Sequence, residues 1–85
     1  MRKPPVNSRQ DYSFVRPEHI RASRAWLGWT LNEMQEKSGL ARDTISRFER
    51  GKQQIANATR GILFQTLVRE GILLLPDGLR VRSEQ

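Results

Sequence analysis

The chain has 85 residues, no cysteine, one histidine and a formal net charge of +6. This length allows one small domain with one core and leaves little room for a buried active site. Without cysteine the chain forms no disulfide or thiolate metal site, and a single histidine makes no metal cluster. No nucleophile–base set, pair of acid–base carboxylates or phosphate loop is visible, so we expect no enzyme, no cofactor and no metal.

The charge favours an anionic partner, nucleic acid first, and arginine strongly outnumbers lysine. Arginine suits bidentate contacts to phosphate or guanine. No apolar run reaches the length of a membrane span or of a signal-peptide core. We therefore expect a soluble cytoplasmic protein that contacts no membrane.

Residues 1–16 lack hydrophobic periodicity and contain two consecutive prolines, which predicts a flexible basic arm. Its basic side chains could follow a phosphate backbone or enter the minor groove, or the segment could have no role. These side chains are Arg2, Lys3 and Arg9. Three apolar residues are unusual in a disordered arm and could fold back on the core or meet a second subunit. They are Tyr12, Phe14 and Val15.

Pro17 suits the first position of a helix that continues to about Leu27, where Gly28 ends it. The residues of this helix that should face the core are Ile20, Ser23, Arg24 and Leu27. We expect both tryptophans, Trp26 and Trp29, to pack in the core rather than to stack on bases.

A capping box, Thr30 to Glu33, predicts that a helix begins at Leu31, and Gly39 suits its end. After a short turn, a second helix should begin at Arg42 and end before Gly51.

In the second of these helices, Ile45 and Phe48 would face inward. The residues left to face outward are Arg42, Asp43, Ser46 and Arg47. Two short helices joined by a glycine-containing turn are typical of a helix-turn-helix, in which the second helix reads the DNA major groove. The spacing alone also fits an ordinary pair of antiparallel helices in a bundle.

The exact residues favour the first interpretation. The segments that decide this are Ile20-Arg21-x-x-Arg24, Gly28-Trp29-Thr30, Glu33-Met34, Ser38-Gly39-Leu40, Thr44 to Gly51, and Leu67-x-x-x-Gly71-Ile72. With these segments, residues 20–72 resemble the XRE family, the Cro- and lambda-repressor-like helix-turn-helix regulators. The resemblance covers about 53 of the 85 residues.

The resemblance implies a recognition helix over residues 42–50 and an ion pair, Arg24 with Glu49, that ties this helix to the scaffold. Implied base contacts are Arg42, Asp43 and Arg47, with Thr44 and Ser46 near the groove. We expect phosphate contacts from residues at and after the end of this helix. They are Arg50, Lys52, Gln53, Gln54 and Asn57, the last of which could also cap the next helix.

Three residues depart from the family pattern. Ala41 stands where a serine or threonine often caps the recognition helix, which predicts a cap weaker by about 1 kcal/mol. Gln35 replaces the small residue that lets the two motif helices approach closely, so their crossing could be looser. Leu31 replaces a polar residue that often touches phosphate.

Residues 57–70 form the longest predicted helix, with Ile62, Leu63, Thr66 and Leu67 on its core side. Beyond Gly71, the Pro-Asp-Gly turn signal predicts a β-hairpin with strands 72–75 and 79–82. Two strands alone are marginal in water, so the hairpin should pack on its own helices or, as we prefer, pair with a second subunit. Phe64 and Val68 would contribute to that homodimer, formed through residues 64–82.

The predicted fold is mainly α: a small lambda-repressor-like helix-turn-helix bundle of about four helices with a C-terminal β-hairpin. Its parts are a flexible arm (1–16), a helix-turn-helix DNA-binding domain (17–71) and a hairpin that could mediate dimerisation (72–85). We expect a sequence-specific dimeric repressor of the bacterial or phage type that binds double-stranded DNA in the nucleoid. Two alternatives use the same fold: an antitoxin or antiactivator that binds a protein partner, and an accessory DNA-binding factor of a mobile element.

Overall fold

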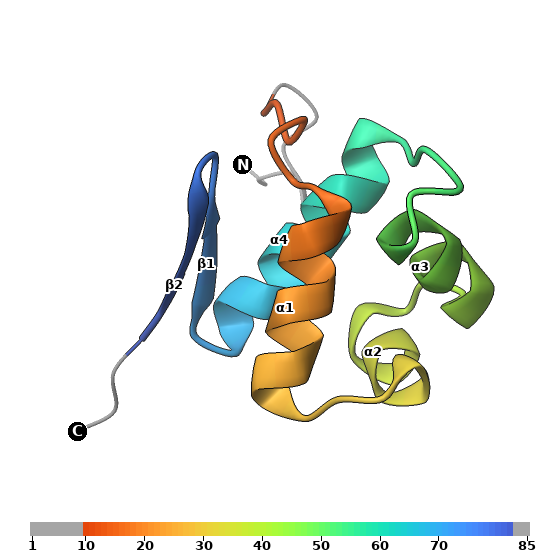
Figure 1. Cartoon of the computed structure of the whole chain (residues 1–85), viewed down its shortest axis with the longest axis horizontal. Coiled ribbons are helices and arrows are strands. Elements are labelled where there is room, and N and C mark those ends of the chain that lie inside the picture. The colour runs from red at the N-terminus through yellow and green to blue at the C-terminus, as the bar shows by residue number, and fades with distance from the viewer. Residues whose placement is uncertain (1–9, 83–85) are drawn as a thin grey trace, which may run out of the picture.

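The computed structural model describes residues 10–82, which form four helices followed by a two-stranded antiparallel hairpin (Figure 1). The elements are α1 (Pro17–Leu27), α2 (Leu31–Ser38), α3 (Arg42–Glu49), α4 (Asn57–Arg69), β1 (Ile72–Leu75) and β2 (Gly78–Val81). In Figure 1, α2 and α3 lie on one side of α1, and the hairpin lies on the other. The predicted mainly α bundle with a C-terminal hairpin is confirmed. None of the helices in residues 10–82 is long and apolar enough to cross a membrane.

The local signals at the helix ends act as predicted. The backbone N–H of Glu33 donates to the Thr30 hydroxyl at 3.1 Å, and the Glu33 carboxylate accepts from the Thr30 N–H at 2.7 Å. Gly28 and Gly39 adopt left-handed conformations at the ends of α1 and α2. A side chain there would be strained, so glycine sets where both helices stop.

One core joins all six elements. Its buried hydrophobic residues are Tyr12, Val15, Ile20, Met34, Ile45, Phe48, Leu63, Leu67, Ile72 and Leu74. The predicted inward face of α3 is therefore confirmed at Ile45 and Phe48, and Met34 is the buried residue of α2. Burial of such side chains is the main term that holds a domain of this size together.

The prediction for Trp26 is wrong, because its side chain is 67% exposed. The neighbouring elements cover the face of α1 that carries Ile20 and Ser23, and Trp26 projects away from that face. Trp29 is half-buried and packs against the core, with the Lys37 ammonium 5.7 Å from its ring centroid.

Residues 10–16 were predicted as part of a flexible arm, and the structure corrects this. Tyr12 and Val15 are buried, and the backbone N–H of Tyr12 donates to Oδ1 of Asn57 at 2.7 Å. The rings of Tyr12 and Phe14 pack on Phe64, with centroids 5.3 and 5.8 Å from it. The segment folds back because its aromatic side chains pack on Phe64 of α4 and are thereby removed from water. The predicted DNA contacts Arg2, Lys3 and Arg9 lie outside the described residues.

The hairpin forms at the predicted turn, but β2 begins at Gly78, one residue earlier than expected. Leu75 pairs with Gly78, so only Pro76 and Asp77 form the loop. Ile72 and Leu74 of β1 are buried on the face of the hairpin that packs on α4. Within this chain the hairpin therefore packs on its own helices, which is the alternative that we considered less favourable.

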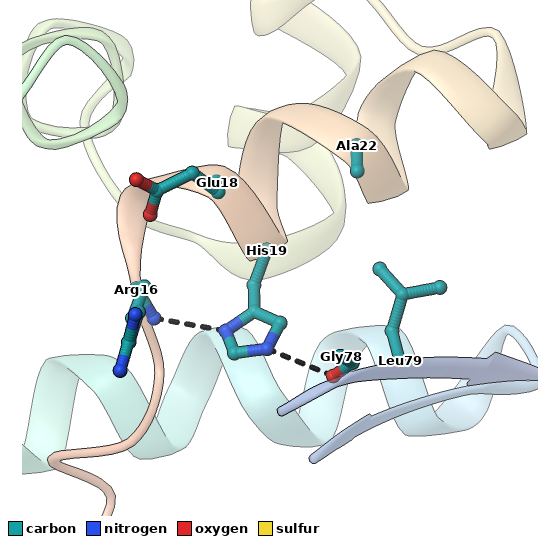
Figure 2. Close-up of a pocket in the computed structure, with 6 residues that line it drawn as sticks. All are labelled: Arg16, Glu18, His19, Ala22, Gly78 and Leu79. Carbon is teal, nitrogen blue, oxygen red and sulfur yellow. Dashed lines mark hydrogen bonds between the residues drawn. The ribbon is translucent and has the colours of Figure 1, made fainter. Parts of the chain in front are cut away.

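His19 connects the start of α1 to the tip of the hairpin (Figure 2). Its buried ring accepts a hydrogen bond from the backbone N–H of Arg16 at Nδ1, at 3.0 Å. Nε2 lies 2.8 Å from the carbonyl oxygen of Leu75 and 2.9 Å from that of Gly78. Since Nδ1 accepts, the proton must lie on Nε2, which donates to the hairpin. Nothing in the sequence indicated these contacts, whose partners lie 56 and 59 positions apart in the chain.

Candidate nucleic-acid interface

Helix α3 has one buried face and one charged face. Ile45, Phe48 and Glu49 are buried, on the side that contacts α1 and α2. Three of the predicted base-contacting residues, Arg42, Asp43 and Arg47, are exposed; the other two, Thr44 and Ser46, are half-buried. The exposed side chains offer two guanidinium donors and one carboxylate acceptor, which are groups that can pair with base edges.

Hydrogen bonds within the turn fix how α3 follows α2. The Ser38 hydroxyl donates to the carbonyl oxygen of Met34 at 2.7 Å and accepts from the backbone N–H of Leu40 at 3.1 Å. Gly39 adopts its left-handed conformation between them, and its N–H donates to the carbonyl oxygen of Gln35. Leu40 is half-buried and packs against the core. The corner of the motif is therefore held by its own backbone and one serine.

The start of α3 has a cap that the sequence did not indicate. Ala41 occupies the N-cap position and supplies no side-chain hydrogen bond, as predicted. The backbone N–H of Arg42 instead donates to Oε1 of Gln35, 2.7 Å away. Two departures from the family pattern, Ala41 and Gln35, thus combine, since the second satisfies a donor that the first leaves without a partner.

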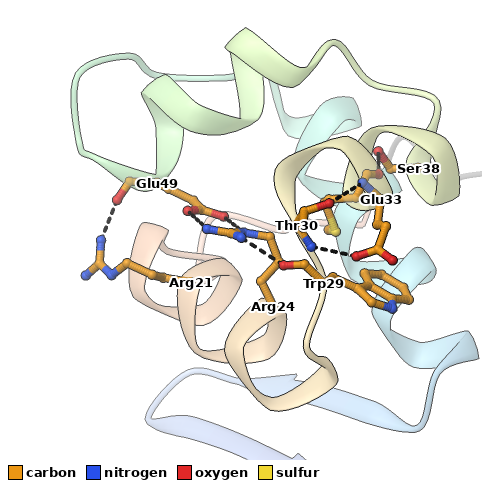
Figure 3. Close-up of polar contacts among 8 residues, drawn as sticks. Arg21, Arg24, Trp29, Thr30, Glu33, Ser38 and Glu49 are labelled. Carbon is orange, nitrogen blue, oxygen red and sulfur yellow. Dashed lines mark hydrogen bonds and ion pairs between the residues drawn. The ribbon is translucent and has the colours of Figure 1, made fainter.

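The predicted ion pair between Arg24 and Glu49 is present (Figure 3). Nε of Arg24 donates to Oε2 of Glu49 at 2.7 Å and Nη2 donates to Oε1 at 2.9 Å. The remaining terminal nitrogen donates to the carbonyl oxygen of Trp29 at 2.9 Å. Hydrogen bonding to Glu49 raises the pKa of Arg24 above its ordinary value. This bidentate geometry fixes both the distance and the orientation between α1 and the end of α3.

A second arginine of α1 also holds α3. Nη1 of Arg21 donates to the backbone carbonyl oxygen of Glu49 at 2.6 Å (Figure 3). That carbonyl lies at the C-terminus of α3, where helix carbonyls lack intrahelical partners and a cation is favoured. Arg21 belongs to the segment Ile20-Arg21-x-x-Arg24 that matches the family pattern, but the sequence did not assign it this contact.

The predicted phosphate-contacting residues after α3 lie on an exposed loop. Arg50, Lys52, Gln53 and Gln54 are exposed, and the loop begins at Gly51 in a left-handed conformation. The backbone N–H of Lys52 donates to the carbonyl oxygen of Arg47, which continues the last turn of the helix.

Arg60 of α4 organises this loop, and sequence reasoning missed it. Its Nη1 donates to the carbonyl oxygen of Ile55 at 3.0 Å, and its Nε donates to that of Val15 at 3.1 Å. Its Nη2 lies 3.3 Å from Oε1 of Gln54. The guanidinium carbon is 5.4 Å from the centroid of the Phe48 ring. One side chain therefore joins the N-terminal segment, the loop and the inner face of α3.

Asn57 does not cap α4, as the sequence suggested that it could. It occupies the first position of α4 and Ala56 occupies the N-cap. Its Oδ1 accepts from the backbone N–H of Tyr12, and its Nδ2 donates to the carbonyl oxygen of Gln10 at 2.7 Å. The amide therefore holds residues 10–12, and its phosphate contact stays a prediction for the second hydrogen of Nδ2.

Comparison with known families is consistent with this geometry. A family model described as helix-turn-helix matches residues 20–60, from α1 into the first turn of α4. No curated protein matches the chain significantly. The match confirms the resemblance to the Cro- and lambda-repressor-like regulators, a family of DNA-binding proteins and not of enzymes.

Proposed function

We propose that the chain is a sequence-specific XRE-type repressor that acts as a homodimer and binds DNA through the helix-turn-helix at residues 20–60. The observation that carries this proposal is the face of α3 that bears Arg42, Asp43 and Arg47, all exposed, opposite a fully buried face. A helix so divided can enter a major groove without exposing its apolar side chains.

The proposed chemistry of recognition follows from these side chains. Arg42 and Arg47 would each donate two hydrogen bonds to O6 and N7 of a guanine. Asp43 would accept from N4 of a cytosine or orient one of the arginines. The exposed cations that follow α3, Arg50 and Lys52, would contact phosphates on either side of the groove.

The proposed dimer would form through the C-terminal part of the chain, residues 64–82. Val68 and Leu73 are 37% and 39% exposed and line one hollow together with Gly71, Ile72, Arg80 and Arg82. Phe64 packs on Tyr12 and Phe14 within the chain, so Val68 and Leu73 are the more exposed apolar side chains of the proposed contact.

Each subunit would read one half of an inverted repeat, with half-sites about one helical turn, roughly 34 Å, apart. Occupation of a promoter would then block access to it. A protein that acts in this way would lie in the cytoplasm of a bacterium, associated with the nucleoid, and would be encoded by the host or by a phage.

The experiment is a selection of duplexes bound by the full chain from a random pool, followed by titrations of the selected duplex. Replacing Arg42 or Arg47 by alanine should weaken specific binding by roughly tenfold or more, because a bidentate guanine contact contributes about 1–3 kcal/mol. Arg16→Ala is the matched control: it removes the same charge from an exposed side chain that lines a hollow with Gly78 and Leu79 and belongs neither to α3 nor to the proposed dimer contact (Figure 2). Sedimentation of the protein with and without DNA reports the number of subunits.

If both α3 variants bind as the wild type does, or if no duplex is preferred at any ionic strength, the proposed function is wrong. The same fold would then be better explained as a protein-interaction module. A monomer on a single half-site would refute the dimer and leave the DNA-binding proposal intact.

A further inference from the structure

The amide of Gln35 lies at the leading end of α3, next to the residue with the first predicted base contact. Gln35 belongs to the last turns of α2, and its Oε1 lies 2.7 Å from the backbone nitrogen of Arg42, seven residues ahead. Both residues are exposed. The contact therefore lies at the surface of the motif and not within its core.

The chemistry of this contact fixes the orientation of the amide. The backbone N–H of Arg42 can only donate, so the oxygen of Gln35 must face it and the NH₂ group must point the other way. In residues 10–82 this NH₂ group has no hydrogen-bond acceptor. The side-chain amide of an exposed glutamine can usually rotate so that its oxygen and its nitrogen change places. Here the oxygen is held by the N–H of Arg42, and the two hydrogens of the NH₂ group remain as donors.

In helix-turn-helix proteins the first residues of the second helix contact base edges. A group bound to the backbone of Arg42 consequently reaches the same region of the DNA as the Arg42 side chain. We propose that Gln35 is a specificity-determining residue: its oxygen fixes the start of α3, and its NH₂ group donates to a DNA acceptor, either a phosphate oxygen or a purine N7. This inference rests on the proposed function.

The cap is tested in the free protein, without DNA. Gln35→Met keeps the length of the side chain and removes both donor and acceptor, and Gln35→Glu keeps the acceptor alone. Amide hydrogen exchange at Arg42 should be faster in the methionine variant by roughly fivefold, as expected for a lost hydrogen bond of about 1 kcal/mol. The glutamate variant should restore the wild-type rate. Equal exchange rates in all three proteins would refute the cap.

The donor is tested with the duplex selected by the wild-type chain. One half-site is scanned with neutral methylphosphonate linkages and, separately, with 7-deazapurines, one position at a time. At one position the wild type should lose roughly tenfold in affinity. Gln35→Met should bind the unmodified duplex about as weakly as the wild type binds the duplex modified at that position. The modification should not lower the affinity of Gln35→Met any further. We call a modification coupled when it weakens binding of the wild type but not of Gln35→Met. A coupled methylphosphonate identifies a phosphate oxygen as the acceptor, and a coupled 7-deazapurine identifies a purine N7.

The other scanned positions are the internal control, because a modification there should lower the affinity of the wild type and of the methionine variant by the same factor. Gln35→Glu should bind no better than Gln35→Met even though its cap is restored, since a carboxylate cannot donate. Absence of a coupled position in both scans would refute the donor role. If the wild type selects no duplex, the proposed function fails together with the donor, while the exchange experiment still decides the cap.

Discussion

Replacing Arg24 by alanine should destabilise the fold strongly. The carboxylate side chain of Glu49 is 6% exposed and receives two hydrogen bonds from Arg24, whose own side chain is 22% exposed. Without the guanidinium, a charged group remains in the protein interior with no partner, and the carbonyl oxygen of Trp29 loses its donor. Loss of one partner of a buried pair costs about 3–5 kcal/mol, and the partial exposure of Arg24 favours the lower end.

A loss of about 3 kcal/mol is a large fraction of the roughly 5–15 kcal/mol that holds a domain together. For a domain of this size it corresponds to a melting temperature lower by about 12–24 °C. The raised pKa of Arg24 means that its contribution is fully present below the ordinary arginine value and is lost only as the pH rises through the higher folded value. The deficit should therefore be the same across the neutral range. Urea denaturation followed by tryptophan fluorescence, with thermal melts by circular dichroism, measures it.

Two further variants distinguish the ion pair from a general effect of truncation. Arg24→Lys keeps the charge and loses the planar pair of donors, so its stability should be intermediate. In the double variant Arg24→Ala with Glu49→Gln, the interior charge is gone, and the combined loss should be smaller than the sum of the two single losses. Strictly additive losses, or an Arg24→Ala protein with an unchanged melting temperature, would refute the reasoning.

Two other predictions concern the segments that flank the motif. Arg60→Ala should lower the free energy of unfolding by about 2 kcal/mol, because two backbone carbonyl oxygens lose a charged donor. Arg60→Lys should recover only part of this loss. Equal stability of the wild type and both variants in urea denaturation would contradict the prediction. The Asp11 carboxylate accepts from the backbone N–H of Ser13, which holds the pKa of Asp11 below its usual 3.8. Its contribution is therefore present above that value and lost as the pH falls through the lower folded value. Asp11→Asn should be slightly less stable than the wild type at neutral pH and equally stable in strong acid; a difference that persists in acid would argue against the carboxylate.

The parts of the fold that sequence predicted are those set by neighbouring residues. Thr30 and Glu33 are three positions apart, and their capping box depends only on that spacing. The glycine stops at Gly28 and Gly39 are equally local. The inward faces of the helices followed from periodicity, and the pair of Arg24 with Glu49 followed from the family pattern.

The parts that sequence missed are side chains that donate to, or accept from, a distant backbone. Arg60 contacts the carbonyl oxygen of Val15 across 45 residues, and His19 contacts the hairpin across more than 50. Neither type of contact leaves a periodic trace, because one partner is a peptide group that every residue carries. The sequence left the fold-back of Tyr12 as one of two possibilities, because its anchor, Asn57, alone resembles a helix cap.

The arginine content also means less for DNA binding than the net charge suggested. Arg21, Arg24 and Arg60 have guanidinium groups that donate to backbone oxygens or to Glu49, so they act on the protein itself. A count of basic residues does not separate these from the exposed Arg42 and Arg47, and only the contacts do. Fewer arginine side chains are consequently free for direct contacts to DNA than a count of basic residues implies, although the guanidinium groups of Arg21 and Arg60 keep their charge.

Arg21 and Arg24 hold the C-terminal end of α3, and Gln35 holds its N-terminal end. Gln35 accepts from the first backbone N–H of α3, and Arg21 and Arg24 bind the carbonyl oxygen and the carboxylate of Glu49, its last residue. A helix of eight residues is marginal alone, and fixing both ends removes the fraying that would otherwise blur the position of its side chains. Base discrimination depends on hydrogen-bond geometry within a fraction of an ångström. Specificity should therefore fall when either end is released, even where every side chain that faces the DNA is kept.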